Sequence, residues 1–131
     1  MRGRLTRELE ARVWLEPRLR ELVEIRTALL NGAADNLLRH AREAVELGET
    51  QHRLAALSAW RRSGLFTTRE RAALALAEAL ARPVDRDALA AARAEAARCF
   101  PPQELANVVF ACVAANASDR LELGIREKRA A

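Results

Sequence analysis

The 131-residue chain is half hydrophobic, so we expect a single domain over residues 1–131 whose core needs neither disulfides nor a structural metal. Its net charge of +4 is a small difference between 22 basic and 18 acidic residues, which alternate as on solvated helix faces, and this argues against nucleic acid as a partner. No apolar run reaches the roughly 20 residues that span a bilayer and no apolar targeting segment follows the N-terminus, so we expect a cytoplasmic protein without a membrane partner.

The composition predicts an all-α fold, because Ala and Leu dominate and the chain has only 5 Gly and 4 Pro. A short amphipathic helix is expected before Pro17, with its apolar positions at Leu5, Leu9, Val13 and Trp14. The next helix begins near Pro17, carries Glu21 and ends at Asn31-Gly32. A further helix then runs to a C-cap at Gly48.

Four more helical segments follow. One runs from near Thr50 to Ser63-Gly64, and the next begins with a capping box of Thr67 and Glu70. Residues 72–80 of that helix are almost continuously apolar, which predicts burial between neighbours. The last two helices open at Asp85 and at Pro101-Pro102. We therefore expect six or seven helices, and the amount of apolar helix surface favours a homo-oligomer.

The two cysteines and the second histidine show no pattern of their own. Cys99 and Cys112 lie far apart within helical patterns, where free thiols are usually small buried hydrophobic residues. His52 has no second ligand at metal-binding spacing. We therefore expect no metal and no cofactor.

A recognisable spacing links the two helices on either side of Asn31-Gly32. Glu21 is followed twelve residues later by Ala33, then by Asn36, and four residues later by His40. This spacing resembles the alkylhydroperoxidase D (AhpD) branch of the carboxymuconolactone decarboxylase family, whose motif is Glu, then Cys-x-x-Cys, then x-x-x-His. Similar segments continue over residues 49–54, 59–67, 70–79 and 116–121, where Asp119 replaces the second Asn of the family's Asn-x-x-Asn-Arg ending.

The resemblance implies an all-α AhpD-like domain with an antiparallel helix hairpin at the site, assembled as trimers or hexamers. The family activity is that of an alkylhydroperoxidase or peroxiredoxin-type antioxidant, in which Glu and His activate the second cysteine. Here Ala33 and Asn36 occupy the cysteine positions, and neither residue can form a thiolate. The resemblance therefore predicts a redox-inactive binding or scaffold protein.

A third departure from the family motif is Asp35, which stands where the family often has His or an aromatic residue. We expect Asp35 to lie at the site, and capping explains it more simply than chemistry, with either Asp35 or Asn36 as the N-cap of the second helix.

The remaining pair, Glu21 and His40, is expected to meet around a small polar pocket. It is either a catalytic acid/base pair or a buried polar pair that stabilises the fold. The first possibility gives an alternative function, because the decarboxylase branch performs acid/base chemistry on a small organic acid or lactone without the two cysteines. Arg39 or Arg26 would then be the cationic partner of this small-molecule ligand.

Overall fold

The computed structural model describes Arg4 and residues 14–125, and within this part of the chain it contains helices and no strands. The elements are α2 (Pro17–Asn31), α3 (Ala34–Glu46), α4 (Gln51–Ala56), the 3-10 helix η1 (Leu57–Arg62), α5 (Thr68–Ala81), α6 (Arg86–Cys99) and α7 (Pro102–Ile125). The all-α prediction is confirmed. The amphipathic helix predicted before Pro17 falls almost entirely outside the described residues.

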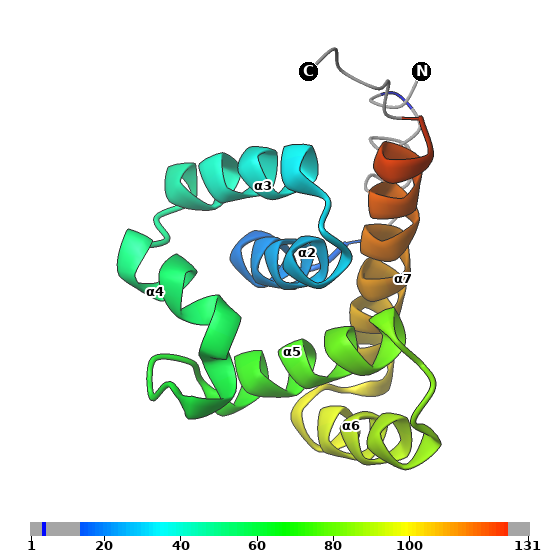
Figure 1. Ribbon diagram of the computed structural model, residues 1–131. Coiled ribbons are helices and arrows are strands. Elements are labelled where there is room, and N and C mark those ends of the chain that lie inside the picture. The colour runs from blue at the N-terminus through cyan, green and yellow to red at the C-terminus, as the bar shows by residue number, and fades with distance from the viewer. Residues whose placement is uncertain (1–3, 5–13, 126–131) are drawn as a thin grey trace.

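Helix α2 lies at the centre of the molecule. Figure 1 shows α3, α4, α5 and α7 arranged around it, with α6 packed beyond α5. The contacts agree, because α2 packs most extensively against α7, α3 and α5. A helix surrounded in this way has no solvated face along most of its length, so even its glutamates at positions 21 and 24 are buried.

The two ends of α2 position the hairpin that follows. The Glu16 carboxylate accepts hydrogen bonds from the backbone N–H groups of Arg18 and Leu19, both at 3.2 Å, and Pro17 occupies the first turn. The helix ends at Gly32, whose φ of 70° is in the left-handed region that favours glycine. Helix α3 begins two residues later and runs back along α2 in the antiparallel hairpin (Figure 1).

Two apolar clusters flank α2. The larger joins α2 to α5, α6 and α7, and the smaller joins α2 to α3, η1 and α5. Helix α5 contributes to both, and residues 72–74, 76 and 77 are buried as predicted, whereas residues 75 and 78–80 are half-buried. It also begins with the predicted capping box, in which Thr67 and Glu70 exchange backbone-to-side-chain hydrogen bonds at 3.1 and 2.8 Å. None of the described helices is both long and apolar enough for a membrane span.

The segment predicted as one helix from Thr50 to Ser63-Gly64 is divided in two. Helix α4 gives way to η1, and Ala59 within η1 has non-helical angles, with φ −133° and ψ 39°. Arg71 of α5 donates to the backbone oxygens of Trp60, Arg61 and Ser63, at 3.0 to 3.1 Å. Tertiary hydrogen bonds therefore satisfy carbonyl groups that a continuous helix would satisfy within itself.

Several ion pairs lie between helices and are partly buried, so the prediction of solvated charged faces is incomplete. Arg53 of α4 bridges the Glu49 carboxylate at 2.9 Å and the Glu70 carboxylate at 2.7 Å. Glu78 of α5 accepts from Arg26 at 2.9 Å and from the Trp60 indole at 2.7 Å. These contacts join α2, α4 and η1 to α5.

Candidate functional site

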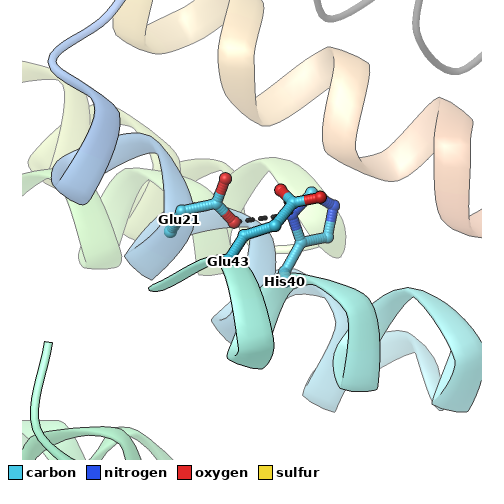
Figure 2. A group of neighbouring side chains, drawn as sticks. All are labelled: Glu21, His40 and Glu43. Atoms are coloured by element: carbon cyan, nitrogen blue, oxygen red, sulfur yellow. Dashed lines mark hydrogen bonds and ion pairs between the residues drawn. The ribbon is translucent and has the colours of Figure 1, made fainter. Parts of the chain in front are cut away.

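The predicted contact between Glu21 and His40 is present. Glu21 comes from α2 and His40 from α3, and the carboxylate Oε2 lies 2.6 Å from the imidazole Nδ1 (Figure 2). Each side chain is only 1% exposed. His40 reaches α2 because it lies one turn along the inward face of α3 from Asn36, which is also buried.

Two further glutamates that were not predicted from the sequence, Glu24 and Glu43, lie around the same imidazole. Glu24 Oε2 lies 3.3 Å from His40 Nε2, and Glu43 Oε2 lies 3.6 Å from His40 Nδ1. Glu24 follows Glu21 by three positions and Glu43 follows His40 by three, so each shares a helix face with a predicted site residue. That spacing was the available signal.

The electrostatics of the cluster favour a charged imidazole. Burial by itself lowers the pKa of His40, but the hydrogen bond that His40 donates to Glu21 and the negative charges of Glu24 and Glu21 outweigh it, so the pKa is raised above 6.5. Burial and the Glu21 charge raise the pKa of Glu43. Arg39 lies 3.6 Å from Glu43 and supplies a second positive charge at the edge of the cluster.

The first position that holds a cysteine in the family motif is taken by Ala33, which is completely buried and has no reactive atom. At the second position, the Asn36 side-chain amide donates to Ser118 Oγ and to Asp119 Oδ1, both at 3.0 Å. Asp119 Oδ2 accepts in turn from Asn31 at 2.9 Å. Burial raises the pKa of Asp119, and the hydrogen bonds from Asn31 and Asn36 oppose that shift. Position 36 therefore belongs to a buried hydrogen-bond network that joins α3 to α7.

The predicted cap of α3 is wrong. The N-cap residue is Ala33, without a side-chain cap, and Glu122 of α7 performs that role from a distance of 86 residues along the chain. The buried Glu122 carboxylate accepts from the backbone N–H of Asn36 at 2.7 Å and of Asp35 at 3.3 Å. A carboxylate at a helix N-terminus meets free N–H groups and the positive end of the dipole, whichever element supplies it. Asp35 itself is half-buried in the first turn of α3.

The two cysteines are free and differ in exposure. Cys112 is completely buried in α7, and burial together with the negative charge of Glu24 raises the pKa of its thiol to about 12. Cys99 at the end of α6 is half-buried and packs against the larger apolar cluster. The prediction that both are small apolar side chains holds for Cys112 and in part for Cys99.

Three surface grooves lie elsewhere on the molecule, and none of them is lined by Glu21, His40 or Asp35. The largest, of about 700 Å³, runs between α5 and α6 over several alanines and Arg61, Arg82 and Arg98. The predicted cationic partners are also engaged. Arg26 pairs with Glu78 in a different groove, whereas Arg39 stays beside Glu43.

Comparison with known proteins places the chain in a family. The model of the carboxymuconolactone decarboxylase family matches residues 4–79, more than half of the chain, and the chain belongs to this family. A crystal structure of ATU0492 from Agrobacterium tumefaciens, a protein of unknown function described as a candidate AhpD antioxidant defence protein, superposes with a TM-score of 0.88. The two are 26% identical, over 98% of this chain and 90% of that one.

A curated relative shares a shorter segment. The uncharacterised protein YdfG of Bacillus subtilis is 39% identical over 59 residues, which are 45% of this chain and 40% of that protein. The match thus spans less than half of the relative. Together with the structural likeness, the family match confirms the AhpD-like fold that the resemblance to this family implied.

Proposed function

We propose that this chain is a redox-inactive, AhpD-like member of its family that acts as a binding or scaffold protein. The observation that carries the proposal is the Asn36 side chain, whose amide is bound to Ser118 and Asp119 at the position of the family's second cysteine. Peroxide reduction by this family begins with attack of a thiolate on the O–O bond. An amide committed to two hydrogen bonds cannot supply that nucleophile.

The cysteines that remain support the same proposal. A thiol whose pKa is about 12 is protonated near neutral pH, and Cys112 is also shielded from solvent. Cys99 is the last residue of α6 and packs against the larger apolar cluster, to which neither Glu21 nor His40 belongs. We therefore infer that this chain shares its fold with the Agrobacterium protein but not the antioxidant activity for which that protein is described.

The test is the reactivity of the native thiols. The folded protein is exposed to a hydroperoxide with a sulfenic-acid trap, and trapped protein is measured by intact mass against the same protein in denaturant. We expect the folded protein to be trapped no faster than the denatured one, because burial suppresses the Cys112 thiolate. Faster trapping in the folded state, or a disulfide between Cys99 and Cys112, would contradict the proposal.

A second candidate is acid/base chemistry on a small organic acid or lactone. The observation that favours it is the 2.6 Å contact in which Glu21 orients His40 and raises its pKa, as a general acid requires. Arg39 is the better placed cation, because it adjoins Glu43 whereas Arg26 is held by Glu78. Consumption of γ-lactone acids by the native protein, abolished in Glu21→Gln, supports this candidate; equal rates in both proteins contradict it.

We also propose that the chain forms a homo-oligomer. Helix α7 packs one side against α2 and α5, while Phe110, Val113 and Leu123 remain 47, 52 and 41% exposed on it. Exposed apolar side chains on a helix favour association with a second surface. Light scattering at micromolar concentration is expected to give a multiple of the 14.5 kDa chain mass, and a monomer would contradict this proposal.

A further inference from the structure

Three potential metal ligands converge at the hairpin of α2 and α3. A carboxylate oxygen of Glu21, an imidazole nitrogen of His40 and a carboxylate oxygen of Glu43 all lie within 4.8 Å of one another. Figure 2 shows both carboxylates directed at the same edge of the imidazole, one from α2 and one from α3. The Glu21 and Glu43 carboxylates lie 2.6 and 3.6 Å from the same nitrogen, Nδ1 of His40. The three donor atoms therefore cluster around one point.

Acidic side chains outnumber basic ones in this cluster. Glu21, Glu24 and Glu43 place three carboxylates within 3.6 Å of a single imidazole, and Arg39 lies at the outer edge beside Glu43. Buried carboxylates are costly unless they are paired, protonated or bound to a metal. A divalent cation between Glu21 and Glu43 would compensate both carboxylates at once.

The second ring nitrogen of His40, Nε2, lies beside a carboxylate, as it commonly does in metal-binding histidines. Glu24, itself 2% exposed, places Oε2 3.3 Å from His40 Nε2. In metal sites the ligating histidine commonly donates its second N–H to a carboxylate, which selects the tautomer and orients the ring. In that tautomer Nε2 carries the proton and Nδ1 presents its lone pair, the donor a metal needs, on the side where Glu21 and Glu43 converge.

We propose that Glu21, His40 and Glu43 bind one divalent transition-metal ion, for which Zn²⁺ is the probe, while Glu24 holds the imidazole in position. One imidazole and two carboxylates suit Zn²⁺ and its first-row neighbours, whereas Mg²⁺ and Ca²⁺ prefer oxygen ligands alone. Metal binding displaces the proton between Glu21 and His40, which is released to solvent. Three protein ligands leave a further coordination position for water or a small anion.

The side chains need only a small adjustment. Ligands about 2.0–2.1 Å from a tetrahedral Zn²⁺ lie roughly 3.4 Å apart. The 3.6 Å separation of His40 and Glu43 is already close to this value, while the 2.6 Å contact of Glu21 and His40 must open. The Glu43 side chain is 41% exposed, which gives an ion a route to the buried donors from solvent.

This proposal is independent of the loss of peroxidase activity. The loss depends on residues 33 and 36, whereas the metal ligands are on other turns of the two helices. The sequence alone predicts no metal, because His52 has no second ligand at metal-binding spacing, and this histidine is exposed on α4.

The test is Zn²⁺ titration of chelator-treated protein by calorimetry, with matched variants. We expect one ion per chain in the native protein and in the control His52→Ala. Binding should be at least tenfold weaker in Glu43→Gln, and weaker by roughly tenfold to a hundredfold in Glu24→Gln, which removes the support of the ring. Equal affinity in the native protein and Glu43→Gln, or no binding by the native protein, would overturn the proposal.

A second readout requires no variant. Co²⁺ added to the native protein is expected to give d–d absorption without a thiolate-to-metal charge-transfer band, because both sulfurs lie outside the proposed ligand set. A charge-transfer band would place the ion on Cys99 or Cys112 and overturn the assignment.

Discussion

The two sides of α2 bury residues of opposite character. Leu19 and Val23 enter the large apolar cluster shared with α5, α6 and α7. Glu21 and Glu24, on the same helix and equally buried, face His40 of α3. The apolar side is stabilised by any well-packed neighbour, whereas the polar side requires specific partners at hydrogen-bonding distance. The polar side of α2 therefore depends on each individual partner, whereas the apolar side depends on close packing.

The polar side extends beyond the histidine. The network around Asn36 and Asp119 and the Glu122 carboxylate at the start of α3 continue it along α7. Cys112 is close to the boundary, since it packs in the apolar cluster while the charge of Glu24 acts on its thiol. The side chain at position 36 is thus held by hydrogen bonds, while the sulfur of Cys112 lies on the apolar side.

The largest expected effect is on the apolar side. Leu76→Ala removes a side chain that is 1% exposed in α5, and the resulting cavity should lower the free energy of unfolding by about 2–5 kcal/mol. Urea unfolding followed by circular dichroism measures it. The control Val113→Ala, 52% exposed, should change stability by no more than about 0.5 kcal/mol. Zn²⁺ affinity should be unchanged in both, and a coupled loss would show that the two sides are not separate.

A smaller effect is expected in the polar network. Asn36→Ala removes the donor to Ser118 Oγ and Asp119 Oδ1 but keeps the backbone hydrogen bond to Glu122, so stability should fall by about 1–3 kcal/mol. The same urea measurement applies. Gln103→Ala on the exposed start of α7 is the control, and an Asn36 variant as stable as this control would show that the network does not hold α3 to α7.

The smallest effect is a pH dependence. Because the pKa of folded His40 is raised above its unfolded value of about 6.5, the pair contributes fully below that pH and its contribution is lost as the pH rises through the folded pKa. His40→Asn should therefore flatten the decline in stability that sets in as the pH rises above about 6.5. Glu21, Glu24, Glu43 and Arg39 all act on this titration.

The measurement is urea unfolding at successive pH values with a chelator present, so that metal binding does not contribute. The exposed His52 provides the control, since His52→Ala should retain the native slope. If His40→Asn also retains it, the pair does not titrate in this range.

Much of the fold could be predicted from local signals. Pro17, Gly32 and the Thr67 capping box mark helix ends through backbone chemistry that acts within a few residues. The division at Ala59 could not be predicted, because its cause is Arg71, which binds the carbonyl groups from the next helix. A contact between side chains and backbone of different helices produces no pattern in the residues next to the break.

The site was predicted in part for the same reason. The family spacing indicated Glu21 and His40, but Asp119 and Glu122 reach the hairpin from α7, more than 80 residues away. The sequence of α7 does contain a pattern that indicates these two acidic residues. Val108, Cys112, Asp119 and Glu122 continue one helical stripe, and acidic residues on an otherwise buried stripe indicate partners in a neighbouring helix.

The most direct test of the central claim is hydroperoxide consumption with excess dithiol, measured for the native protein and for its Cys99→Ser, Cys112→Ser double variant. We predict that both proteins consume hydroperoxide no faster than dithiol alone, because the remaining thiols cannot replace those missing at positions 33 and 36. Turnover by the native protein that disappears in the double variant would contradict the account, since it would show that Cys99 and Cys112 have taken over the redox role.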